Sequence, residues 1–154
     1  DHFKKVNDTH GHEAGDEILQ VVAQRIQSDL RGFDTAVRFG GEEFVVLLPD
    51  SSLASAEAAA ERLCLLVSAE PIAVSGIETK LDVTVSIGVA SMVAGDGDLE
   101  ELLRCADAAL YEAKRTGRNK VVTSSEKSPS SADRAGQKSL YAVPTQQSAE
   151  NAVR

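Results

Sequence analysis

The stretch AVRFGGEEFVVLL, at residues 36–48, holds two short apolar runs on either side of two glycines and two glutamates. Runs rich in β-branched and aromatic residues are typical of strands, and a glycine pair between them is typical of a tight turn. Pro49 and Asp50 follow directly and end the second run. The stretch therefore predicts a β-hairpin with strands at 36–39 and 44–48, around which the other elements are arranged.

Apolar residues on both sides of the hairpin recur with periods that distinguish helices from strands. Three stretches have apolar residues every three or four positions, which indicates helices with one buried face. Asp98 and Glu101 form a capping box at the start of the last of these helices, and Gly117 suits its C-terminal cap. Alternating or short apolar runs indicate further strands. We predict helices at 18–30, 53–68 and 99–113, and strands at 72–74, 81–89 and 121–122.

The predicted order of elements is α-β-β-α-β-β-α-β, and one preceding strand would give it a βαββαβ core. This pattern predicts an α+β fold with a central, mainly antiparallel sheet and helices packed on one face. The first residue is Asp1 rather than Met, so we expect a fragment from which the first strand is missing.

Composition sets limits on the class of protein. The 154 residues are 42% hydrophobic and 26% charged, which is ordinary for one globular domain. The net charge of −8 argues against a protein that binds nucleic acid by phosphate neutralisation. No apolar run approaches the roughly 18 residues of a membrane helix, and Cys64 and Cys105 are expected to be reduced core thiols of a cytoplasmic protein. Residues 124–154 are rich in Ser and Gln without a period, so we predict a compact unit at 1–123 and a disordered tail at 124–154.

The hairpin turn itself has two interpretations. The simpler one is a turn with glycines at positive φ and two solvated acids, and the turn taken alone favours it. In the other, Gly40 and Gly41 let a ligand approach the backbone closely. The carboxylates of Glu42 and Glu43 would then hold a hard cation such as Mg²⁺ together with substrate phosphates.

Three further clusters of polar residues also have both a structural and a functional interpretation. The polar N-terminal segment is either a loop before a helix or, through Asn7 and Asp16, a pair of groups that bind a guanine edge. The basic residues at 114–120 suit the C-terminus of a helix or a polyphosphate. Arg31 and Asp34 are either a surface ion pair or part of a binding site.

Taken together and in order, these groups resemble the GGDEF family, the diguanylate cyclase domains of bacteria. The resemblance covers residues 1–123 and is carried by five groups of residues. They are DHFKKVND at 1–8, Gly11-His12 with Gly15-Asp16, RFGGEEF at 38–44, VSIGV at 85–89, and Ala106-Asp107, Tyr111, Ala113-Lys114 and Gly117-Arg118-Asn119.

The resemblance implies a signalling enzyme that condenses two GTP molecules into cyclic di-GMP and releases two pyrophosphates. It implies Mg²⁺ as cofactor, a homodimer in which the 3′-hydroxyl of one GTP attacks the α-phosphate of the other, and allosteric inhibition by the product. The implied catalytic residues are Glu42, a Mg²⁺ ligand, and Glu43. The implied GTP-binding residues are Phe3 (through its backbone amide), Lys4, Asn7, Asp16, Gly40, Gly41, Lys114 and Arg118. The implied inhibitory site for cyclic di-GMP consists of Arg31, Asp34 and Arg62.

The resemblance also implies a metal-binding Asp two residues before Asp1, outside this chain. We therefore expect the chain alone to be poorly folded and inactive, and about 30 upstream residues, one βαβ-like opening, to restore both properties. One rival interpretation is a catalytically silent receptor that binds cyclic di-GMP only at the inhibitory site. Another is a different nucleotidyl cyclase or a polymerase-palm enzyme, which the predicted guanine-binding pair disfavours. The intact Glu42-Glu43 pair favours the cyclase, and any sensory, dimerising or membrane-attached region would lie upstream.

Overall fold

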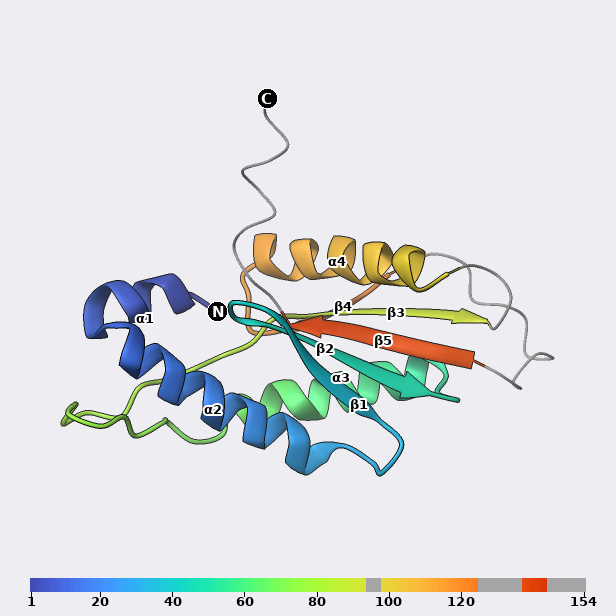
Figure 1. Cartoon of the computed structure of the whole chain (residues 1–154). Coiled ribbons are helices and arrows are strands. Elements are labelled where there is room, and N and C mark those ends of the chain that lie inside the picture. The colour runs from blue at the N-terminus through green and yellow to red at the C-terminus, as the bar shows by residue number, and fades with distance from the viewer. Residues whose placement is uncertain (94–97, 125–136, 144–154) are drawn as a thin grey trace.

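The computed structural model describes residues 1–93, 98–124 and 137–143, and contains one five-stranded sheet with helices on both faces (Figure 1). The order of strands across the sheet is β1-β2-β5-β3-β4, and all pairs are antiparallel except β3 with β4. This is the predicted α+β fold with a mainly antiparallel sheet. The elements are α1 (Phe3–His10), α2 (His12–Asp29), β1 (Thr35–Gly40), β2 (Glu43–Pro49), α3 (Leu53–Ser68), β3 (Ile87–Val93), α4 (Leu99–Arg115), β4 (Val121–Thr123) and β5 (Gln137–Val143).

The predicted hairpin is confirmed. β1 and β2 pair from Thr35 opposite Leu47 to Gly40 opposite Glu43. Buried and partly buried residues alternate along β2, and the two sets contribute to two different apolar clusters. The fully buried set packs with α2 and α3, and the other set packs with α4.

Our prediction of helices on one face of the sheet was wrong. Figure 1 shows α4 above the sheet and α2 and α3 below it. Because β2 is apolar at almost every position, both of its faces need a covering layer, as in sheets whose strands read as continuous apolar runs.

The helices after the hairpin have the predicted bounds to within two residues. Ser52 caps α3, since its Oγ accepts from the Ser55 amide at 3.2 Å. Asp98 caps α4 in the same way, accepting from the Glu101 amide at 2.9 Å, as the capping box predicts. Gly88 in β3 lies directly beneath α4, and a Cβ there would be 2.1 Å from the Ala106 carbonyl oxygen.

Three segments, two before β3 and one at the N-terminus, differ from the predictions. Residues 72–74 form only an isolated bridge, in which the Ile72 and Leu81 amides each donate to the other's carbonyl at 2.8 Å. The predicted strand at 81–89 is present only from Ile87. The polar N-terminal segment is a separate helix, α1, with no buried residue, and Gly11 (φ 87°) separates it from α2.

The strand β5 corrects the prediction of a disordered tail at residues 137–143. Its backbone pairs antiparallel with both β2 and β3, so that Tyr141 lies opposite Val46 on one side and Val89 on the other. Without a strand there, the facing N–H and C=O groups of β2 and β3 would lack ladder partners. The rest of the predicted tail, 125–136 and 144–154, lies outside the described residues.

Both cysteines are free thiols, Cys64 buried and Cys105 partly buried. Burial raises the pKa of Cys64, and its Sγ donates to the Val85 carbonyl at 3.4 Å. Among the described helices, none has the length and apolar character required to cross a membrane.

Candidate functional site

The turn between β1 and β2 lies beside the N-terminus of the chain and on the same side of the molecule as the C-terminal end of α4 (Figure 1). Arg38 fixes this turn, because its guanidinium donates from Nε to the Gly41 carbonyl at 3.0 Å and again from Nη2. Neither Gly40 nor Gly41 has the positive φ of the simpler interpretation, which was wrong on this point. Instead the pairing shifts register between Arg38 and Gly40. A Cβ on Gly40 would lie 3.2 Å from Oε2 of Glu43, so glycine lets this carboxylate lie close over the turn.

Charged groups gather at the turn. Partial burial raises the pKa of Glu42; the Asp1 amino group and Lys114 lower it, and Glu43 raises it. Burial lowers the pKa of Lys114, against the carboxylates of Glu43, Glu42 and Asp107, which raise it. Glu42 of the turn, Glu43 at the start of β2 and Lys114 of α4 therefore share one partly buried site.

The carboxylates of this turn suit a divalent cation bound together with a nucleotide. Mg²⁺ prefers oxygen ligands and usually takes one or two carboxylates along with phosphate oxygens. Across the described residues, no three His, Cys, Asp or Glu side chains gather as a metal-binding group. Glu42 and Glu43 would therefore supply part of the ligand set, and phosphate oxygens are the natural source of the remainder.

Asp1 connects the N-terminus of the chain to the segment before β3 and to the turn after α4. The sequence analysis did not identify Asp1 as a residue of the site. Its carboxylate accepts from Ser86 Oγ at 2.7 Å, from Thr84 Oγ1 at 2.9 Å and from the Asn119 amide at 3.2 Å. Arg118 and Asn119 both have positive φ, 61° and 45°, which is unusual for residues other than glycine. Asp1 thus anchors the strained turn that carries Arg118. The hydroxyls at positions 84 and 86, in the half-polar stretch at 81–89, were the available signal.

The helices α1 and α2 meet at a second set of predicted residues. Asn7 Oδ1 is buried and has no hydrogen-bond partner within the described part of the chain. Gly15 of α2 lies against it, because a Cβ at Gly15 would be 2.0 Å from Asn7 Oδ1 and 2.8 Å from Phe3 Cζ. The unpaired amide oxygen is a ready acceptor for a ligand N–H group.

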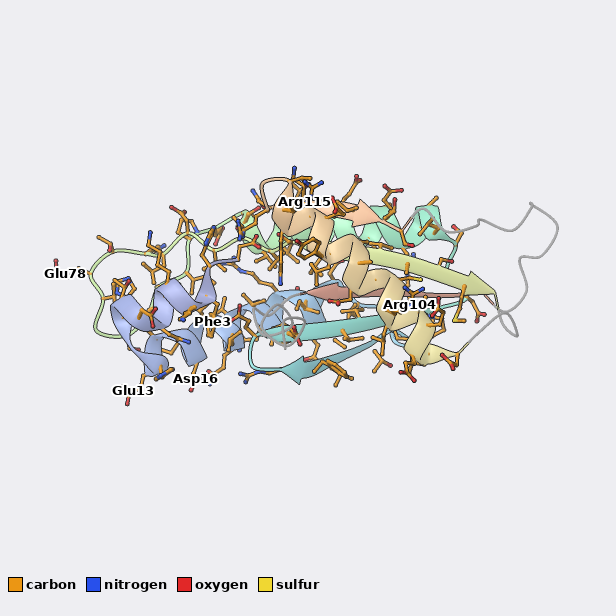
Figure 2. All side chains as sticks on the ribbon, turned by 90° about the horizontal axis from the view of Figure 1, so that it is seen from above. Phe3, Glu13, Asp16, Glu78, Arg104 and Arg115 are labelled. Carbon is orange, nitrogen blue, oxygen red and sulfur yellow. The ribbon has the colours of Figure 1, made fainter. Side chains whose placement is uncertain are left out.

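Two hollows extend from this helix pair. A cavity of about 40 Å³ is lined by Asp1, Phe3, Glu42 and residues 82–85, which precede β3. It therefore connects α1 to the turn. An open groove of about 430 Å³ runs between α2 and the hairpin, with Asp16 and Arg38 on its walls. Figure 2 shows Phe3 nearer the sheet than Asp16, which lies on the outer side of α2. Lys4 is exposed on α1.

A separate pocket contains the predicted inhibitory residues. It has a volume of about 30 Å³, and its lining includes Arg31, Asp34 and Arg62. Asp34 Oδ2 accepts from the Arg31 amide at 2.8 Å. Asp29, which the sequence analysis did not identify, also lines the pocket and forms an ion pair with Arg62 at 2.7 Å.

Sequence comparison identifies the family to which these features belong. The family profile described as "Diguanylate cyclase, GGDEF domain" matches residues 1–120. The chain belongs to the GGDEF family. The response regulator PleD of Caulobacter vibrioides is 51% identical to this GGDEF chain over 123 residues, which are 79% of the chain and 27% of PleD. The chain thus spans about a quarter of that relative's length.

Solved GGDEF structures share the fold. The GGDEF domain of DgcB from Caulobacter crescentus, in complex with c-di-GMP, superposes with a TM-score of 0.76 at 35% identity, covering 80% of this chain and 72% of that one. The active GGEEF domain of a diguanylate cyclase from Vibrio cholerae gives a TM-score of 0.74 at 34% identity, covering 82% and 79%. The expected family and fold are therefore confirmed.

The GGDEF chain gathers its predicted residues into three places. The turn holds Glu42 and Glu43 with Lys114 beside them, the α1–α2 junction holds Asn7 near Phe3, and the separate pocket holds the inhibitory residues. Asp16 follows Gly15 on α2 and lies on the wall of the open groove.

Proposed function

We propose that this chain is the catalytic domain of a diguanylate cyclase, which condenses two GTP molecules into cyclic di-GMP. The observation that carries the proposal is the placement of Glu42, Glu43 and Lys114 around one turn, connected by a narrow cavity to the helix that bears Asn7. Within one site, this arrangement offers two carboxylates for a cation, the Lys114 ammonium group for phosphates and the unpaired Asn7 oxygen as an acceptor for a nucleobase.

Binding of GTP would follow from these groups. Asn7 Oδ1 would accept from a guanine N–H group, and Asp16 would offer a carboxylate to the same edge of the base. Backbone N–H groups at the N-terminus of α1, starting with Phe3, and the Lys4 side chain would meet the phosphates, since a helix N-terminus favours anions. Lys114 and Arg118 would add positive charge at the triphosphate.

The chemistry joins two nucleotides in two equal steps. The 3′-oxygen of one GTP forms a bond to the α-phosphorus of the other, the bond to the bridging oxygen of pyrophosphate breaks, and the hydroxyl loses its proton. Repetition of this step with the roles exchanged closes the ring and releases the second pyrophosphate. Two chains, each presenting one GTP, would form the homodimer that the step requires. Positioning is the main contribution of the protein to such transfers.

Glu42 would hold Mg²⁺ at the turn, and Glu43 would assist with the cation or the attacking hydroxyl. When bound, the cation supplies charge stabilisation for the phosphoryl group and the departing pyrophosphate. Gly40 and Gly41 leave room for the nucleotide to lie against the turn, since neither carries a Cβ.

The test is incubation with GTP and Mg²⁺, followed by chromatography of the nucleotides and measurement of pyrophosphate. It uses both the 154-residue chain and a protein extended upstream of Asp1, because the GGDEF resemblance implies a further metal-binding Asp there. We expect the extended protein to yield one cyclic di-GMP and two pyrophosphates per cycle, and Glu42→Gln to abolish this activity. Glu78→Gln, on a loop remote from the turn (Figure 2), is the matched control. A folded, dimeric extended protein without product would contradict the cyclase proposal.

The separate pocket supports a second activity, binding of the product. Two arginines and two aspartates on its walls match a ligand that has both phosphates and guanine N–H donors. In the cyclase this site would give feedback inhibition, and in a silent receptor it would be the only functional site. Unchanged product inhibition in Arg31→Ala would refute this assignment.

A further inference from the structure

Asp29 lies at the C-terminal end of α2, which is an unfavourable position for an acidic side chain. It is the last residue of α2, where the helix dipole disfavours negative charge, and the last turn of α2 contains no basic residue. Its side chain is only 15% exposed. The helix dipole therefore does not account for an aspartate here.

The two carboxylate oxygens of Asp29 are in different states. Oδ1 accepts from Arg62 Nε at 2.7 Å, whereas Oδ2 is buried and has no donor within the described part of the chain. Asp34 has the same asymmetry, since Oδ2 accepts from the Arg31 amide and Oδ1 is buried without a donor among the described residues. Buried polar atoms without partners are rare and costly in folded proteins. One small pocket is lined by both of these residues.

We propose that Asp29 is a further ligand-binding residue of this pocket and that it selects guanine. One oxygen orients Arg62, and the other accepts from an N–H donor of a guanine base. The proposal rests on the proposed binding of cyclic di-GMP, and it adds a second carboxylate that recognises the base beside Asp34. Guanine presents adjacent N–H donors at N1 and N2 to such an acceptor, whereas adenine presents an acceptor at N1 and a donor only at N6.

The substitution Asp29→Asn distinguishes this role from a merely structural one. An asparagine can still accept from Arg62 through its oxygen, but it then presents an NH₂ donor where the unpaired oxygen was. A donor there opposes guanine and suits the N1 acceptor of adenine. The variant should therefore change the selectivity for the base, in addition to the affinity.

The experiment is isothermal titration of the 154-residue chain, or of the extended protein, with cyclic di-GMP and with cyclic di-AMP. We expect the wild type to prefer cyclic di-GMP, and Asp29→Asn to weaken its binding about 10- to 100-fold, the loss expected for a charge-assisted hydrogen bond. Binding of cyclic di-AMP should be unchanged or tighter. Glu61→Gln, which removes an exposed acid beside Arg62 on α3, is the charge-matched control and should bind as the wild type does.

Two outcomes would overturn the inference in distinguishable ways. Equal weakening of both ligands by Asp29→Asn would show that Asp29 acts only through Arg62 and does not contact the base. Absence of cyclic di-GMP binding to a folded wild type would remove the pocket's assignment altogether, while the turnover assay with GTP tests the cyclase separately.

Discussion

Gly88→Ala should separate α4 from the sheet and destabilise the whole domain. The added Cβ would lie 2.1 Å from the Ala106 carbonyl oxygen and 2.3 Å from the Leu110 amide nitrogen, where ordinary contact starts at 3.4 Å. Both neighbours are backbone atoms, so neither can rotate away. The helix must instead retreat by about 1 Å, and a gap of this size forfeits a quarter to a half of the dispersion energy at the interface.

The cost follows from what α4 buries. Its buried face consists of two leucines and three alanines, and each fully buried leucine contributes roughly 1.5–3 kcal/mol. Losing about a third of that interface, with some strain, destabilises the domain by about 2–4 kcal/mol. Alanine in place of glycine lowers the entropy of the unfolded chain and recovers about 0.5–1 kcal/mol. The net expected loss is therefore about 1–3.5 kcal/mol.

Urea denaturation at constant m-value measures this loss directly. Gly32→Ala is the control, because a Cβ at Gly32 has nothing within 4 Å, and its effect should stay within about 0.5 kcal/mol. A Gly88→Ala protein as stable as the wild type would show that α4 does not pack this closely on β3, and it would refute the reasoning.

Three further predictions concern the tail, the anchor residue and the helix junction. Deletion of residues 125–154 removes β5 and should lower the melting temperature and broaden the transition in circular dichroism; an unchanged melt would restore the disordered-tail prediction. Asp1→Asn weakens three hydrogen bonds to a charged group and should cost about 2 kcal/mol in a thermal shift assay, whereas Asp8→Asn, exposed on α1, should cost almost nothing. Gly15→Ala should displace the flexible side chain of Asn7. It should therefore weaken binding of a fluorescent GTP analogue more than it lowers stability, and unchanged affinity would remove Asn7 from the site.

Clear apolar periodicity predicted the hairpin and α3 in the middle of the chain. The elements near the two ends of the chain, α1 and β5, lack such periodicity and were not predicted. The hairpin and α3 have apolar periods and end signals that agree, so their bounds were predictable from the sequence. Helix α1 buries no residue and is held by its packing on α2, which no periodicity reveals. The strand β5 depends on an open position between β2 and β3, and only the assembled sheet shows that this position exists.

The candidate site shows the same division. Resemblance supplied the residues of the turn and of the α1–α2 junction, since these lie in contiguous runs. Asp1 and Asp29 act through partners distant in the sequence, Ser86 in one case and Arg62 in the other. Pairings of this kind depend on tertiary structure, which a single sequence without relatives does not display.

The central position of β5 has a consequence for how the domain forms during synthesis. Its partner β2 precedes it by 89 to 99 residues along the chain, from Pro49 opposite Lys138 to Phe44 opposite Val143. Contacts so distant in sequence form slowly, because a long loop must close before they contribute. Among the five strands that the structure describes, the ribosome makes this one last, so the middle of this sheet is completed after its other strands. Until then β2 and β3 present open edges, and nascent chains in this state are the ones most exposed to aggregation and to capture by chaperones.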